Sequence, residues 1–170
     1  MYNETGGLVN STVRARVTPD RKQMQRAIRT FLVPQIRSLG FSGRFPHFRR
    51  QNNNEHHLLM IFFNKYGGSF YVDAGRISDA EFRNIREHWL KSGKELDESK
   101  LTVGHCNWRN RARLGELGFI RDDNYWYTYG PENTSSTSRV EQPAKYYEKV
   151  ALRAASHLGL HADKFFSSTL

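Results

Sequence analysis

The feature that most constrains the fold of this chain is a pair of apolar runs with two glycines between them. The first run, HHLLMIFFNKY at residues 56–66, is the most hydrophobic stretch of the chain, and SFYVDAGRI follows at residues 69–77. The glycines at 67–68 are typical of a tight hairpin turn. Before them, FSGRFPHFRRQNNNE alternates Phe with polar residues and ends in a turn signal. Together these stretches predict three consecutive antiparallel strands.

On both sides of this meander the hydrophobic period changes from about 2 to about 3.6 residues, which is typical of helices. A first helix is predicted to begin at Asp20, to be bent or interrupted by Pro34, and to end at Gly40. A second helix is predicted to begin after Ser78, which forms a capping-box pattern with Glu81. A final helix, with one apolar face, is predicted to end at Gly159.

The predicted fold class is therefore α+β. We expect an antiparallel β-sheet of about four to six strands with a meander core, and helices from both chain ends packed on one face. The aromatic stretch NYWYTYG at residues 124–130 is read as a further strand. The predicted organisation is an N-terminal arm at 1–18 and a single domain at 19–170, with a loop at 130–140 before a C-terminal helix at 142–159.

The chain carries 26 Lys and Arg against 17 Asp and Glu, a formal charge of +9. This charge favours an acidic partner, either a protein surface, nucleic acid or anionic lipid, although it also serves solubility alone. A single cysteine excludes an internal disulfide framework and fits a reducing compartment. No apolar run reaches the roughly 18 residues that span a bilayer, and no secretory signal is visible. A cytoplasmic protein without membrane contact is expected.

In HCNWRNRARLGELGF, residues 105–119, the only cysteine stands beside a histidine. A catalytic thiol needs a base within reach, but neighbouring residues of a strand point to opposite faces. Cys106 is therefore predicted to be a buried structural residue, and an enzyme that uses it remains the alternative. Asp73 lies within an apolar strand and is predicted to form a structural ion pair, with Arg76, Arg111 or Arg113 as its partner.

No metal or cofactor is predicted. The pair His56–His57 and the i,i+4 pair His157 and His161 are candidate ligands, but one cysteine cannot build a thiolate-rich zinc site. A histidine near a helix C-terminus also interacts favourably with the helix dipole. The stretch GFSGRF lacks the lysine spacing of a P-loop and the glycine pattern of a dinucleotide-binding turn.

Two segments, RFPHFRR at 44–50 and NWRNRAR at 107–113, mix aromatic with basic residues. Such a mixture can stack bases and hold phosphates, and it is equally typical of protein–protein hot spots. The residues predicted to bind a partner are Arg44, His47, Arg49, Arg50, Arg76, Trp108, Arg109, Arg111, Tyr125 and Tyr127.

Three stretches in this order resemble a bacterial family known as domain of unknown function 4304. They are FLVPQIRSLGFSGRFPHFRR, LLMIFFNKYGGSFYVDAGRI and HCNWRNRARLGELGFIRDDNYWYTY, which together span about residues 28–129. Asp73 stands where Asn is more usual in that family. The resemblance implies an α+β fold and brings no catalytic residues. It also implies that Cys106, Arg113 and Glu116 are structural, with residues 113–117 anchoring a short helical turn on the sheet.

The leading functional hypothesis is a non-enzymatic protein-binding domain, an immunity protein that binds and neutralises a bacterial toxin. Its acidic partner would contact a basic, aromatic-rich surface. The alternative is a nucleic-acid-binding domain that uses a basic aromatic sheet face.

Overall fold

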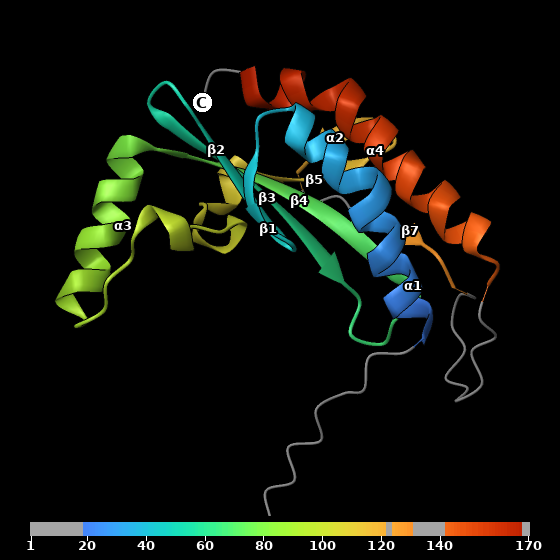
Figure 1. Cartoon of the computed structure of the whole chain (residues 1–170). Helices are drawn as coiled ribbons and strands as arrows, with labels where there is room; N and C mark the ends of the chain where they lie inside the picture. Colours follow the sequence, from blue (N-terminus) through green and yellow to red (C-terminus); the bar gives the residue numbers. More distant parts are fainter. Residues whose placement is uncertain (1–18, 122–123, 131–141, 168–170) are drawn as a thin grey trace, which may run out of the picture.

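The computed structural model describes residues 19–121, 124–130 and 142–167, so the expected arm at 1–18 and most of the expected loop at 130–140 lie outside the described residues. Seven strands form one antiparallel sheet in the order β1-β2-β3-β4-β5-β6, with β7 paired to β4 (Figure 1). The α+β fold and its meander are confirmed. The strands are β1 (Ser42–Arg44), β2 (His47–Asn52), β3 (Glu55–Phe63), β4 (Ser69–Ser78), β5 (Arg111–Gly115), β6 (Gly118–Ile120) and β7 (Tyr127–Thr128).

The segment expected to form the first strand of the meander forms two. The chain turns at a cis Phe45–Pro46 bond, so that β1 folds back on β2. Gly43 lies opposite Phe48 with a φ of +105°, and a Cβ there would lie 2.8 Å from the carbonyl oxygen of His47. A glycine is required because the two strands approach too closely for a side chain. The short strands β1, β6 and β7 account for the sheet being larger than expected.

Helices from both ends of the chain cover one face of the sheet, as predicted (Figure 1). These are α1 (Pro19–Ala27), the π-helical turn Ile28–Leu32, α2 (Val33–Ser38) and α4 (Ala144–Ser167). They bury alternate residues of the strands, including Leu59, Ile61, Phe63, Phe70 and Val72. This alternation is expected for strands with one face against a core.

The predicted interruption of the first helix is confirmed. Residues 28–32 form a π-helical turn, and the backbone N–H of Val33 donates to the carbonyl of Ile28 at its end. Pro34 follows directly, and it has no N–H to offer a carbonyl in the preceding turn. The helical hydrogen bonding therefore shifts by one residue just before the proline.

The prediction that the last helix ends at Gly159 is wrong, since α4 continues to Ser167. The residues beyond Gly159 include Ala162 and Phe166, which are buried against the sheet. Their burial outweighs the low helix propensity of glycine. Gly159 also lies close to the first helix, because a Cβ there would be 3.1 Å from Nε2 of Gln35. In the described part of the chain no helix is both long and apolar enough to cross a membrane.

The second face of the sheet is covered over only part of its area. Helix α3 (Asp79–Lys91) begins with the predicted capping box between Ser78 and Glu81. With the segment at 94–110 it covers Leu58 of β3 and Ile77 of β4. The residues that pack there from this segment are Leu96, Leu101, Val103 and Cys106.

Candidate functional site

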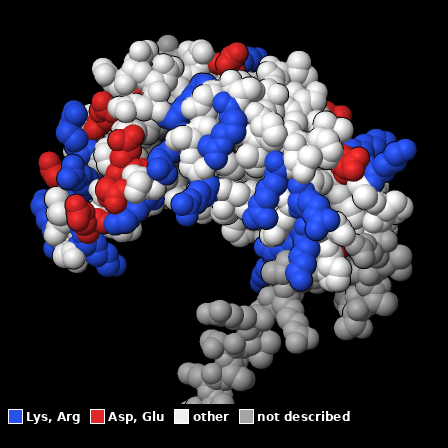
Figure 2. All heavy atoms as spheres, viewed as in Figure 1, with Lys and Arg blue, Asp and Glu red and all other residues white. Residues whose placement is uncertain are grey.

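The part of the second sheet face that α3 does not cover carries a row of aromatic and charged side chains. Phe62 and Tyr71 stack with ring centres 5.1 Å apart, and Trp126 meets Tyr71 edge-on at 4.7 Å. Figures 1 and 2 show this side of the sheet as the hollow underside of an arch, with α3 at one end. We call this surface the open face, and it consists of Phe62, Tyr71, Asp73, Arg111, Arg113 and Trp126.

Strand register brings these residues together. Phe62 of β3 lies opposite Tyr71 of β4, and Asp73 of β4 lies opposite Arg113 of β5. Residues opposite each other in an antiparallel pair point to the same face, as do residues two positions apart. Phe62 is 46% exposed, and Tyr71 is partly exposed. The row is therefore formed by three neighbouring strands and by Trp126, which directly precedes β7, and it remains open to solvent.

Asp73 is buried beneath this row and is paired with two arginines. Nε of Arg113 donates to its Oδ1 at 3.0 Å, and Nη2 of Arg111 lies 3.7 Å from its Oδ2. Burial raises the pKa of Asp73, and the two arginines oppose that shift. The predicted structural ion pair is confirmed with Arg111 and Arg113 as partners. One carboxylate facing two guanidinium groups leaves the open face with a positive charge.

Cys106 packs against the backbone of β4, as its predicted structural role requires. A Cβ on Gly75 would overlap the Sγ of Cys106, so only glycine fits at this point of the strand. Burial raises the pKa of Cys106 to about 12. At neutral pH the side chain is a thiol and not a nucleophilic thiolate. The Nδ1 atom of His105 accepts a hydrogen bond from the backbone N–H of Thr102 at 3.1 Å.

Two of the predicted partner-binding arginines lie instead on the helix-covered face. Arg76 is 5% exposed and forms a two-pronged contact with Glu55, with nitrogen–oxygen distances of 2.9 and 3.0 Å. Arg50 donates to Nδ1 of His57 at 3.1 Å, and its guanidinium lies over the ring of Phe166. Burial lowers the pKa of His57. This corrects the expectation for Arg76 and Arg50, because both complete an internal cluster beneath the end of α4.

The two predicted tyrosines also lie on that face. Tyr127 is completely buried, and its hydroxyl lies 3.0 Å from Nδ1 of His157. Tyr125 meets Tyr127 edge-on at 5.1 Å. This corrects the expectation that they present their rings to a partner, because both rings contact His157 of α4. His161 packs beside Gly118, and within the described ranges no group of three or more His, Cys, Asp or Glu could hold a metal ion.

The remaining predicted residues lie at the two ends of the sheet. Trp108 is 60% exposed, and the guanidinium carbons of Arg109 and Arg121 lie 5.4 and 5.6 Å from its ring centre. Arg44 and His47 are exposed at the β1–β2 end, and Arg49 donates to the carbonyl of Ser99 at 2.8 Å. Strands β3 and β4 separate these two groups, so they do not form one site.

Glu116 lies in a β-hairpin, because residues 113–117, which are expected to anchor a short helical turn on the sheet, form the end of β5 and the hairpin turn. Gly115 pairs with Gly118, so Glu116 and Leu117 form the exposed two-residue connection between β5 and β6. Gly118 has a φ of +112°, which favours glycine in such a turn. The role of Glu116 is therefore in the turn and not in anchoring a helix.

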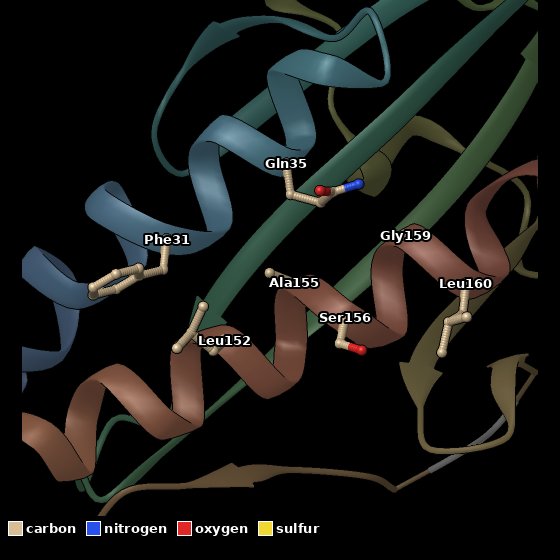
Figure 3. A pocket seen from close by; sticks show the side chains of 7 residues that line it. All are labelled: Phe31, Gln35, Leu152, Ala155, Ser156, Gly159 and Leu160. Carbon is tan, nitrogen blue, oxygen red and sulfur yellow. The ribbon is translucent and has the colours of Figure 1, made fainter.

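A hollow of roughly 470 Å³ lies between the first helix and α4 on the outer side of the helical layer. Figure 3 shows that side chains of both helices line it, with the amide of Gln35 lying above Gly159. Apolar groups and two uncharged polar side chains make up its lining. The lining residues are Phe31, Gln35, Leu152, Ala155, Ser156, Gly159 and Leu160.

Comparison with known proteins assigns the chain to a family. A family model described as "Domain of unknown function (DUF4304)" matches residues 32–142. The chain belongs to the DUF4304 family. No curated protein and no solved structure matches it.

The match to DUF4304 includes every strand of the sheet and α3, and therefore the whole open face. Sequence reasoning missed three residues of that face, namely Phe62, Tyr71 and Trp126. The available signal was the alternation in HHLLMIFF, which places Phe62 on the same side as Leu58 and Met60. That signal could not tell which side helices would cover.

Proposed function

We propose that this DUF4304 protein is a non-enzymatic binding protein that recognises an acidic protein through the open face. The observation that carries the proposal is the continuous row formed by Phe62, Tyr71, Arg113 and Trp126 on a sheet surface that no described element covers. Aromatic rings and arginine are the residue types that most often carry the binding energy of protein interfaces. The row rests on rigid strands, so little conformational entropy is lost when a partner binds.

The charge of the open face sets the chemistry of the partner. Asp73 is neutralised by Arg113, and Arg111 adds a further positive charge. Arg109 and Arg121 beside Trp108 extend that charge beyond the start of β5. An acidic surface would complement these groups and would associate faster at low ionic strength.

Neutralisation of a toxin is the form of this function that we place first. A chain without a recognised catalytic motif can act by covering the working surface of another protein. The shape and composition of the open face support this form, because they fit a protein surface with an apolar centre and an acidic rim.

The test is to capture the partner from cells that express the gene. The affinity of the partner for variants of the open face is then compared with its affinity for the wild type. We expect the tagged wild type to retain a protein at moderate salt and Phe62→Ala to weaken the affinity by about 30-fold or more, the size of a hot-spot loss. The matched control is Leu152→Ala, since Leu152 is also exposed, but on the outer face of α4. Failure to retain any protein, or equal retention by Phe62→Ala and the wild type, would refute the proposal.

A further inference from the structure

The positive charge of the chain is concentrated in one segment. Residues 21–54 contain eight Lys and Arg and no Asp or Glu, so they account for eight of the nine net positive charges. Five of the eight side chains are exposed. We call these five the basic ridge, and they are Lys22, Arg26, Arg29, Arg37 and Arg44.

The helix and the edge strand of this segment form one continuous surface. The guanidinium carbon of Arg29 lies 4.8 Å from the ring centre of Phe45 in the β1–β2 turn. Arg37 donates to the carbonyl oxygen of Phe41 at 3.0 Å and also to that of Gly43. These contacts hold the first helix beside β1. Figure 2 shows Lys and Arg over the front of the molecule, where these elements lie, and a mixture of both charges over α3.

Three members of the ridge follow one side of a helix. Lys22, Arg26 and Arg29 are separated by four and three residues, so they project from the same face. At 1.5 Å per residue their spacing along the axis is about 5 to 6 Å. Alternate phosphates of one nucleic-acid strand are about 7 Å apart along a duplex. Long, flexible side chains can adjust to that small difference.

The surroundings of the ridge distinguish it from the open face. None of the exposed large hydrophobic side chains of the described residues lies between positions 19 and 54. The exposed neighbours include the small hydroxyl residues Thr30, Ser38 and Ser42. A protein interface requires apolar anchors, whereas phosphate groups are bound by Lys and Arg together with Ser, Thr and Asn.

We propose that the basic ridge is a second, independent interaction surface that binds the phosphate backbone of nucleic acid without reading its bases. The ridge offers cations and hydroxyl groups but no exposed aromatic ring for base stacking. Binding therefore depends on phosphate charge and not on base sequence. The proposal concerns a different surface from the open face and stands whether or not a protein binds there.

Fluorescence anisotropy with two labelled probes tests the proposal. The probes are a uridine homopolymer of about 20 nucleotides and a duplex DNA of similar length, titrated between about 50 and 200 mM NaCl. Wild-type protein is expected to bind at least one probe with an affinity that falls as salt rises. Each phosphate contact contributes about 0.7 to 0.9 to the slope of log K against log salt.

The variant Lys22→Gln/Arg26→Gln/Arg29→Gln is expected to lower that slope by about 2 to 3. The matched control is Arg83→Gln/Arg86→Gln/Lys91→Gln, which removes the same charge from the exposed side of α3. The control is expected to keep the wild-type slope. If the first triple variant does not fold by circular dichroism, the double variant Lys22→Gln/Arg26→Gln replaces it, with an expected decrease of about 1.5 to 2.

Three outcomes would overturn the proposal. The first is that neither probe binds at the lowest salt. The second is that both triple variants weaken binding equally, because the effect would then follow net charge and not the ridge. The third is that polyglutamate competes as well as the unlabelled uridine homopolymer per unit charge, which would favour an acidic protein. Phe62→Ala is expected to bind each probe with the affinity of the wild type, which separates this result from a failure of the open face.

Discussion

The guanidinium of Arg113 lies 3.6 Å from the centre of the Tyr71 ring, and its Nε donates to Asp73 at 3.0 Å. One side chain of β5 thus contacts both the buried carboxylate of Asp73 and the aromatic ring of Tyr71 on β4. The same guanidinium lies 5.5 Å from the ring of Trp126. The stability of this part of the sheet and the shape of the open face therefore depend on the same contact.

Replacing Arg113 by leucine leaves Asp73 with only the longer contact to Arg111. We expect the free energy of unfolding to fall by about 3 kcal/mol, the usual cost of removing one partner of a buried ion pair. Arg113→Lys keeps the positive charge but loses the planar group that stacks on Tyr71. Its free energy of unfolding should lie between those of the wild type and Arg113→Leu. Urea unfolding measures these differences. The exposed Arg83→Leu is the control, with an expected change within about 0.5 kcal/mol. Equal effects of Arg113→Leu and the control would contradict the prediction.

The stability of Asp73→Asn relative to the wild type should depend on pH. Burial raises the pKa of Asp73 above its ordinary value of 3.8. At a pH between 3.8 and the raised pKa of the folded protein, Asp73 has lost its proton in the unfolded chain but keeps it in the folded protein. The wild type therefore loses stability as the pH rises through this range. The loss stops above the pKa of the folded state. Urea unfolding of both proteins from about pH 4 to about pH 7 tests this. A wild type that gains stability over Asp73→Asn with rising pH would show the opposite sign.

Gly75→Ala should be strongly destabilising, because its Cβ would overlap the Sγ of Cys106. We expect a loss of about 2 kcal/mol or more in the free energy of unfolding. Adding Cys106→Ala removes the Sγ, and the Cβ of residue 106 then lies 3.2 Å from the new Cβ of residue 75. In a double-mutant cycle this second change should restore about 1 kcal/mol of the free energy of unfolding. Gly104→Ala is the control, since the nearest atom would be Oγ1 of Thr102 at 3.4 Å. Strict additivity of the two changes would be inconsistent with this contact.

The thiol of Cys106 should react slowly in the folded protein. Its pKa of about 12, against an ordinary value of 9.0, lowers the thiolate fraction near pH 8 by roughly a thousandfold. Burial limits access of a reagent further. A chromogenic disulfide reagent, added with and without denaturant, measures both rates. A folded-state rate equal to that of the unfolded chain would mean that the side chain is accessible.

Glu55→Gln should destabilise the internal cluster, because the buried guanidinium of Arg76 loses its carboxylate. The expected decrease is about 3 kcal/mol in the free energy of unfolding. Glu95→Gln, a change of the same type at an exposed position, should alter stability by less than about 0.5 kcal/mol. Thermal or urea unfolding of the two variants gives the comparison. Equal stabilities of Glu55→Gln and Glu95→Gln would contradict the prediction and would show that solvent screens the Glu55–Arg76 pair.

Local patterns in the sequence were sufficient for much of the fold. The capping box of Ser78 and Glu81, the glycine turn at 67–68 and the interruption at Pro34 all depend on residues within a few positions of one another. Such interactions have the same geometry wherever the segment lies, so they can be recognised without knowing its neighbours. The α+β class, with helices from both chain ends on a single face of the sheet, follows from the order of these elements.

The site depended on information that the sequence does not contain locally. Arg76 and Arg111 belong to neighbouring strands and are both arginines, yet one is buried against Glu55 and the other faces Asp73. Only the register of the strands and the choice of the face that α4 covers decide between these environments. Likewise, α4 continues through Gly159 because Ala162 and Phe166 find a core to join. By itself the sequence determined the elements and their caps, whose forces act over a few residues. The tertiary structure alone decided which side chains remain on the open face, because burial there depends on segments far apart in the chain.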